Sequence, residues 1–211
     1  MRFLDKLILP IACLVGLIPI STAAATETLD SVLGRAAAQQ QTVIDYREVR
    51  YMQLLSQVWQ AEGRIYLSGF SFIINQLSPQ KQLLVADRTR IWLLNPKHNI
   101  RRSMMLTAPM AQKSFSFIMP IIQGDRKSLE KHFNIAFSDE QGEWHIELAP
   151  KRGEESQYSH IILSGPNGKA AERMRTELYD GDYSEWFFSQ QPFNDETQKQ
   201  VEQLIREAKG I

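Results

Sequence analysis

The chain has 211 residues, and its 24 basic and 24 acidic side chains give a formal net charge of zero. This balance excludes the basic excess that is typical of nucleic-acid-binding proteins. A hydrophobic fraction of 43% is ordinary for a globular protein of this length and allows a sizeable core. We therefore expect a globular protein with no nucleic-acid partner.

Residues 1–25 have the three-part pattern of a secretory signal peptide. Arg2 and Lys6 precede an apolar run over 7–20, and small residues ending at Ala25 follow it. The alternative is an uncleaved membrane anchor, but the run holds only about 14 residues, short of the roughly 20 that span a bilayer. We expect cleavage after Ala25 and export to the periplasm.

The mature part opens with a predicted helix over 27–41, and a strand-like alternation follows from residue 43. Neither face of the 43–52 segment is cleanly apolar, which predicts a strand near the edge of a sheet. Roughly five further strands follow at short intervals, so neighbours are expected to pair antiparallel as a meander. Those strands cover 56–68, 70–76, 83–86, 91–94 and 99–106.

Residues 107–132 interrupt this pattern with two prolines and a helical tail, which predicts short helices. Roughly five more strands follow, separated by turns that contain glycine. They cover 133–138, 143–150, 159–165, 171–180 and 183–190. The chain ends in a predicted helix over 195–209, whose apolar stripe is Val201, Leu204, Ile205 and Ala208. The sequence thus predicts one domain over 26–211, with about eleven antiparallel strands and a few helices.

The motif search gives no catalytic or metal site. The four histidines lack the spacing of metal ligands, and Cys13, the one cysteine, is expected to leave with the signal peptide. No serine lies in a Gly-x-Ser-x-Gly elbow, and Asp180-Gly181-Asp182 fits a turn better than an acid–base pair. We expect no catalytic residue, no metal and no cofactor, although residues that converge from distant strands keep an enzyme as an alternative.

The stretch 83–96, LLVADRTRIWLLNP, is apolar on both faces of its two predicted strands. A strand with one face in water should alternate, so both faces must be covered. A sheet that curls into a half barrel meets this requirement, with helices over part of one face and an apolar cavity for the rest. The residues fit a filled core and a cavity equally well.

The segment 109–122 is too apolar for a surface connection and is predicted to form a lid over that face. Methionines in and before this segment can adapt their shape to varied partners. The predicted lid residues are Phe115, Phe117, Ile118, Met119, Ile121 and Ile122.

The run 63–96 combines a glycine-led strand, an aromatic strand, a proline turn, an apolar strand that ends in Asp, and an apolar-Trp strand that ends in Asn-Pro. Its distinguishing residues are Gly63, Phe70, Phe72, Pro79, Leu84, Val85, Asp87, Trp92 and Pro96. This combination resembles the periplasmic lipoprotein carrier family, LolA. The segments 108–138 and 144–151 resemble the helical insertion and a later strand of the same family.

The resemblance implies an unclosed eleven-stranded antiparallel barrel with a helical lid over an apolar cavity. It also implies a carrier that takes acyl chains from an inner-membrane exporter to an outer-membrane acceptor, without a cofactor and without changing a bond. The chain departs from the family at Leu67-Ser68-Gly69, where an Arg-Pro pair that helps to latch the lid is usual, at Asp87-Arg88, and in its C-terminal helix. We expect a divergent, monomeric relative whose cargo is a lipoprotein or another acylated lipid.

The residues expected to line the cavity are Ile65, Leu67, Phe70, Phe72, Ile74, Leu84 and Trp92. One register step would exchange Leu84 for Leu83 and Val85, so the inward face of that strand stays open. Two other functions also stay open. A lipid-sensing regulator would need a partner surface, for which the C-terminal helix is a candidate, and a lipid-modifying enzyme would need a buried polar constellation in the cavity.

Overall fold

Eleven strands form one antiparallel sheet in the computed structural model, which describes residues 26–39, 41–53, 57–109, 111, 117–154 and 156–211. The strand order is β6-β5-β4-β3-β2-β1-β11-β10-β9-β8-β7, so β6 and β7 are edges and the sheet is not closed. The strands are β1 Gln41–Met52, β2 Gln57–Ser68, β3 Ser71–Ser78, β4 Gln82–Ala86, β5 Arg90–Asn95, β6 Ile100–Met105, β7 Phe133–Glu140, β8 Glu143–Pro150, β9 Tyr158–Pro166, β10 Arg173–Leu178 and β11 Tyr183–Gln191. The predicted eleven-stranded unclosed antiparallel sheet is confirmed.

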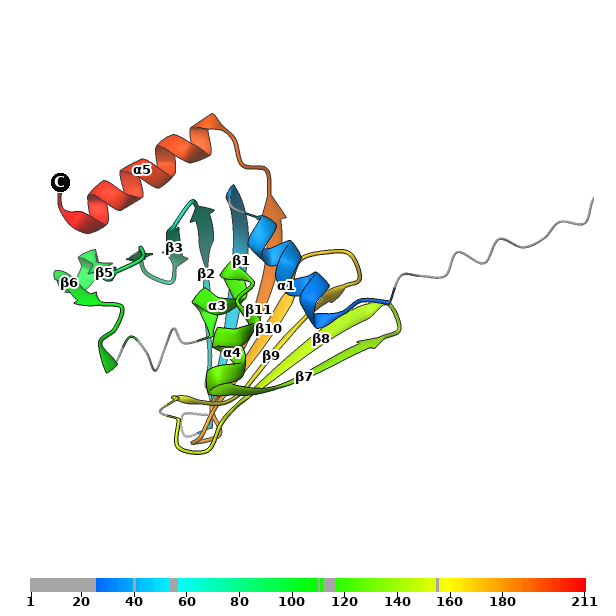
Figure 1. The fold of residues 1–211 in the computed structure, drawn as a ribbon. Coiled ribbons are helices and arrows are strands. Elements are labelled where there is room, and N and C mark those ends of the chain that lie inside the picture. The colour runs from blue at the N-terminus through cyan, green and yellow to red at the C-terminus, as the bar shows by residue number, and fades with distance from the viewer. Residues whose placement is uncertain (1–25, 40, 54–56, 110, 112–116, 155) are drawn as a thin grey trace, which may run out of the picture.

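Helices lie on both faces of this sheet (Figure 1). They are α1 Leu29–Ala38, the 3-10 turn η2 Pro96–His98, α3 Ile118–Gln123, α4 Arg126–His132 and α5 Asp195–Lys209. In Figure 1, α1, α3 and α4 lie together in front of the sheet, whereas α5 lies apart from them beside β3 and β5. We call the face under α3 the inner face and the face under α5 the outer face.

The inner and outer faces of β2–β5 both carry apolar cores. On the inner face, Leu67, Phe72 and Ile91 belong to a buried cluster that packs against Ile118 and Met119. The outer-face cluster consists of Val43, Tyr66, Ile73, Leu83, Val85 and Leu94, packed against Val201, Leu204 and Ala208 of α5. The second apolar face of the 83–96 hairpin is therefore covered by the C-terminal helix.

Capping and charge hold α5 in this place. Asn194 accepts a hydrogen bond from the Thr197 N–H at 2.9 Å, which satisfies a free donor at the start of the helix. Gly210 ends the helix with a left-handed backbone, φ 77°. Arg101 of β6 donates from Nη1 to the Glu207 carbonyl at 2.7 Å, so a cation meets the negative end of the helix dipole. The predicted apolar stripe thus packs on the sheet.

The other half of the sheet carries a third core, which α1 and α3 share. Leu33 of α1, Leu129 of α4 and Trp144 of β8 are buried in it, and Ile118 and Ile121 of α3 pack against it. Ile118 also packs against the inner-face cluster of β2–β5, so α3 bridges the two halves. The predicted short helices are present in this segment at α3 and α4.

Strand β1 is the sixth of eleven in the sheet order, between β2 and β11, so its predicted position near an edge is wrong. Its mixed character has two causes. Outward residues such as Asp45 reach solvent, where Asp45 pairs with Arg64 at 2.8 Å. Inward residues include Glu48 and Arg50, which line an internal cavity. A polar residue that faces a cavity gives the same alternation as one that faces water.

Candidate functional site

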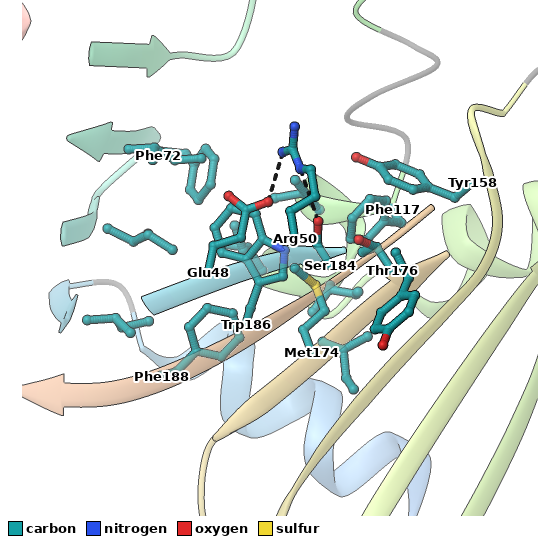
Figure 2. A pocket seen from close by; sticks show the side chains of 18 of the residues that line it. Glu48, Arg50, Phe72, Phe117, Tyr158, Met174, Thr176, Ser184, Trp186 and Phe188 are labelled. Carbon is teal, nitrogen blue, oxygen red and sulfur yellow. Dashed lines mark hydrogen bonds and ion pairs between the residues drawn. The ribbon is translucent and has the colours of Figure 1, made fainter. Parts of the chain in front are cut away.

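A cavity of about 440 Å³ lies between the inner face of the sheet and α3 (Figure 2). Strands β1, β2 and β3 form one wall, and β9, β10 and β11 form the other. The roof is α3 together with Phe117, which precedes it. The volume falls within the range of roughly 300–1,000 Å³ that is typical of small-molecule sites.

Most of the cavity is apolar. Alternate residues of neighbouring strands meet there because the register pairs Ile44 with Ile65, and Ile65 with Ile74. Trp186 and Phe188 of β11 form the opposite wall, and their ring centroids are 6.5 Å apart. This end of the cavity therefore offers hydrocarbon and aromatic surface with no charged group among those five side chains.

Gly63 makes room for Tyr46, which packs beside the aromatic wall of β11. The ring centroids of Tyr46 and Trp186 are 5.2 Å apart. Gly63 of β2 is the register partner of Tyr46. A Cβ at Gly63 would come within 2.9 Å of Tyr46 Cε1 and would also meet the backbone of β3. The glycine that leads the 63–96 run therefore makes room for a buried tyrosine. Burial of this ring raises the pKa of Tyr46, with a smaller contribution from the charge of Glu48.

The roof consists of four apolar side chains from a short segment. Phe117, Ile118, Ile121 and Ile122 all line the cavity. Phe117 meets Tyr158 of β9 edge to face, with ring centroids 5.4 Å apart. The helix α3 has only six residues and no side-chain cap at its start, so it depends on its apolar contacts for its position.

The structure brings together most of the residues that were predicted to line a cavity or a lid. Those that line the cavity are Ile65, Leu67, Phe72, Ile74, Phe117, Ile118, Ile121 and Ile122. Leu84 and Met119 pack against the inner-face cluster, and Leu84 pairs in register with Ile74. Its neighbours Leu83 and Val85 belong to the outer-face cluster, which answers the register question for β4. Phe115 lies outside the described residues.

Two predicted cavity residues lie elsewhere, and their placement is corrected here. Phe70 is 62% exposed in the turn between β2 and β3, where the Arg88 guanidinium lies 3.1 Å from its ring centroid. Trp92 packs against the outer-face cluster, with Lys209 Nζ 4.4 Å from its ring centroid. The sheet pleat explains Trp92, because its register partner Val85 also points outward.

The other end of the cavity is polar. Arg50 donates from Nη2 to Glu48 Oε1 at 2.8 Å and from Nε to Ser184 Oγ at 3.3 Å, as the dashed lines in Figure 2 mark. Glu48 is only 3% exposed, and Ser184 and Thr176 are also buried. The register places Arg50, Ser184 and Thr176 side by side on β1, β11 and β10. We call these four residues the polar end.

The polar end and the aromatic wall of β11 were not predicted from the sequence. The signal for the polar end was the inward alternation of Ile44, Glu48 and Arg50 in a long strand, which also fits an edge strand in water. For Trp186 and Phe188 the signal was the YSEWFFSQ segment, an aromatic strand with serines at both ends. Neither pattern identifies a cavity until the sheet order is known.

The polar end does not have the geometry of a nucleophilic site. A serine nucleophile needs a base within hydrogen-bond reach. In the described part of the chain, the hydrogen bond of Ser184 Oγ is to the cationic Arg50, and no histidine lines the cavity. Asp180 accepts a hydrogen bond from the Asp182 N–H at 3.1 Å, as expected of a turn.

The described residues hold no group of three or more His, Cys, Asp or Glu side chains that could bind a metal ion. Within the same part of the chain, no helix is long and apolar enough to cross a membrane.

One protein family and several solved structures are similar to this chain. The family model described as "Outer membrane lipoprotein carrier protein LolA" matches residues 47–201. Similar solved structures include an uncharacterized conserved protein from Thermus thermophilus, with TM-score 0.49, 10% identity, and coverage of 82% of this chain and 93% of that chain. A putative outer membrane lipoprotein-sorting protein domain from Vibrio parahaemolyticus gives TM-score 0.45, 14% identity, and coverage of 79% and 91%. A LolA superfamily protein from Nitrosomonas europaea gives TM-score 0.44, 12% identity, and coverage of 81% and 96%. Among curated proteins, none matches this chain.

Proposed function

Since this chain belongs to the outer membrane lipoprotein carrier protein LolA family, we propose that it carries the acyl chains of a lipoprotein or another lipid between the inner and outer membranes. The observation that carries the proposal is the apolar cavity of about 440 Å³ between the sheet and α3. Acyl chains are the cargo that such a lining stabilises most, because the cavity removes hydrocarbon from water without requiring hydrogen bonds.

The energetics favour a carrier that holds its cargo loosely. Burial stabilises each methylene by about 0.8 kcal/mol, so a chain of about sixteen carbons gains on the order of 12 kcal/mol gross. A rigid cavity with that affinity would release its cargo slowly. The roof allows release because α3 is a helix of only six residues, held by apolar contacts. Such a short helix can move away from the cavity at a small cost in free energy.

The route follows from the N-terminal segment and the cargo. Residues 1–25 direct export and are then removed, so the mature chain works in the periplasm. It receives its cargo from an inner-membrane exporter and passes it to an outer-membrane acceptor. The transfer needs no cofactor and changes no bond, and a monomer is sufficient for it.

The two alternative functions have less support than the carrier. The apolar stripe of α5 is the candidate partner surface for a regulator, but Val201, Leu204 and Ala208 are buried against the sheet. A lipid-modifying enzyme would use the polar end, but there Ser184 Oγ accepts a hydrogen bond from the cationic Arg50, and among the described residues it has no hydrogen bond to a base.

Native mass spectrometry of the protein purified from the envelope of its own host tests the proposal. We expect a fraction with the mass of the chain from Thr26 onward plus one acylated molecule, and a delipidated sample should regain that mass on exposure to membranes from the same host. A single mass for the bare chain, together with failure to bind any long-chain probe, would overturn the proposal.

A further inference from the structure

The polar end contains an ion pair whose carboxylate is buried and whose guanidinium is about half exposed. Glu48 lies at the centre of the sheet, with 4% of its side chain exposed, whereas the Arg50 side chain is 46% exposed. Removing a carboxylate from water costs several kcal/mol, and a single partner recovers this cost only in part. An apolar residue in place of Glu48 would avoid this cost, so stability alone does not account for a carboxylate at this position.

Each member of the pair also has a hydrogen-bonding atom without a partner among the described residues. The hydrogen bonds within the polar end use Glu48 Oε1 and the Nη2 and Nε atoms of Arg50. Within the described residues, Glu48 Oε2 has no donor and Arg50 Nη1 has no acceptor at hydrogen-bond distance, and both residues line the cavity. The Glu48 carboxylate, a strong acceptor, and the Arg50 guanidinium, a strong donor, therefore lie next to each other at one end of the apolar cavity.

Several contacts hold these two groups in place. The Arg50 guanidinium lies 5.0 Å from the ring centroid of Trp59, its register partner on β2, and donates to Ser184 on β11. Glu48 is held between Ala61 of β2 and Trp186 of β11 by the same register. Groups that are positioned in this way lose little conformational entropy when a ligand binds.

The charge at this end selects against anions. Glu48 and Asp182 are acidic and Arg50 is basic, and these are the charged residues among those that line the cavity in the described part of the chain. One negative charge is thus in excess. A phosphate or carboxylate that approached Arg50 would also approach Glu48, its 2.8 Å partner, and would be repelled. An uncharged group that donates one hydrogen bond and accepts another satisfies both residues.

We infer that Glu48 and Arg50 select acylated cargo with an uncharged head group, which donates a hydrogen bond to Glu48 and accepts one from Arg50. This inference rests on the proposed carrier function and specifies its cargo. Hydroxyl and secondary amide groups both have this chemistry. A hydroxyl is typical of an acylglycerol, and an amide is typical of an N-acylated chain end.

The test compares head groups on one chain length. Purified, delipidated protein is titrated with 1-monopalmitoylglycerol, N-methylpalmitamide, methyl palmitate and 1-palmitoyl lysophosphatidate by displacement of an uncharged fluorescent probe, the methyl ester of a fluorescent long-chain fatty acid. We expect the hydroxyl or the amide ligand to bind about tenfold more tightly than methyl palmitate, which accepts but cannot donate, and lysophosphatidate to bind least tightly. If 1-monopalmitoylglycerol binds more tightly, the head group is a hydroxyl, as in an acylglycerol. If N-methylpalmitamide binds more tightly, it is an amide, as in an N-acylated chain end.

Two variants separate recognition from folding. Glu48→Gln should reduce the preference for the donor ligands over methyl palmitate, because the charged acceptor is lost. The double variant Glu48→Leu and Arg50→Leu removes the pair as a unit and should bind all neutral probes equally. Its thermal unfolding should be no less cooperative than that of the parent. The readout is a ratio of affinities, which a general loss of structure does not change.

The possible failures are distinct. If methyl palmitate and all other probes fail to bind the parent protein, the carrier proposal fails. If all probes bind the parent equally, or if Glu48→Gln leaves the ratio unchanged, the cavity binds chains but the inferred selection is wrong. Tighter binding of lysophosphatidate than of the neutral ligands overturns the charge argument.

Discussion

Ile73 and Ile74 are consecutive in β3 and belong to different environments. Ile73 has 0% exposure in the outer-face cluster under α5, whereas Ile74 lines the cavity on the inner face. The pleat of a strand sends successive side chains to opposite faces, so each position reports on one face only. The two residues have the same side chain, which makes them a matched pair for separating stability from binding.

The same substitution should have different effects at the two positions. Ile73→Ala leaves a hole in a packed core and should lower the free energy of unfolding by about 2–4 kcal/mol, with little change in probe affinity of the folded protein. Ile74→Ala removes surface next to an existing cavity, so it should cost less stability and should weaken acyl-probe binding. Urea unfolding and probe titration measure the two effects. Equal losses of stability with equal affinities would contradict this division of the faces.

Phe72 and Phe70 test the corrected placement of the aromatic residues. Phe72 lines the cavity with 4% exposure, and Phe70 is 62% exposed in the preceding turn. Phe72→Glu should abolish binding of an uncharged fluorescent acyl probe while circular dichroism still reports a folded sheet, because the new carboxylate would place a charge in the apolar lining of the cavity. Phe70→Glu is the matched control and should leave affinity within about twofold of the parent. Loss of binding in the control, or retention in Phe72→Glu, would contradict the placement.

The periodicity of the sequence was sufficient to identify the strands, but not to place β1 within the sheet or to assign the two faces. A two-residue period identifies strands and their order in a meander, and it also shows that the 83–96 hairpin is apolar on both sides. The period does not tell which face of the sheet a helix covers and which face lines the cavity. Leu83 and Leu84 lie on different faces but have the same side chain. The helix α5, more than 100 residues later in the chain, decides which of them points outward.

The polar end illustrates a second limit of the sequence. Glu48 and Arg50 have the alternation of an exposed edge strand, and only the pairing of β1 with β11 moves them to the centre of the sheet. That pairing joins residues that are more than 130 positions apart. Their partners Thr176 and Ser184 are ordinary strand residues in the sequence, so no local pattern connects the three strands.

Glu27 should make the fold sensitive to acid. It accepts hydrogen bonds from the Ser31 hydroxyl and from the Gly168 N–H, the latter at 2.7 Å, and it pairs with Arg35 at 2.9 Å. These contacts lower the pKa of Glu27 from 4.5 to about 2. The hydrogen bond from Ser31 contributes most, followed by those from Gly168 and Arg35. The folded state therefore binds this proton less readily than the unfolded state. The stabilisation is complete above pH 4.5 and is lost as the pH falls toward 2.

The variant Glu27→Gln isolates this contribution. At pH 7 it should lower the free energy of unfolding by about 1–2 kcal/mol, because charge-assisted hydrogen bonds become neutral ones. Between pH 4.5 and 2 it should lose less stability than the parent, so the two curves converge. Urea unfolding across this range is the measurement. Asp30→Asn, at an exposed ion pair with Arg126, should change stability by less than about 1 kcal/mol. Parallel pH curves for the parent and Glu27→Gln would contradict the assignment.

Gly124 connects the roof of the cavity to α1. It ends α3 with a left-handed backbone, φ 65°, and a Cβ there would come within 2.8 Å of the Leu33 carbonyl oxygen and 2.9 Å of Ala37 Cβ. Both contacts are with α1, so a larger residue must push α3 away from the helix on which it rests. Gly142, in the turn between β7 and β8, has a similar φ of 83° but no neighbouring atom within 4 Å of a Cβ.

Gly124→Ala and Gly142→Ala should therefore both strain the backbone, but only Gly124→Ala should also clash with α1. The strain should cost each variant about 1–2 kcal/mol of stability, and the clash should cost Gly124→Ala roughly 1–3 kcal/mol more. Only Gly124→Ala displaces the roof, so it alone should release a bound acyl probe faster than the parent, since an open roof exposes the cavity to water. Stopped-flow displacement measures this rate at matched fractions of folded protein. Equal release rates for the two variants would show that the contact of α3 with α1 does not control the opening of the cavity.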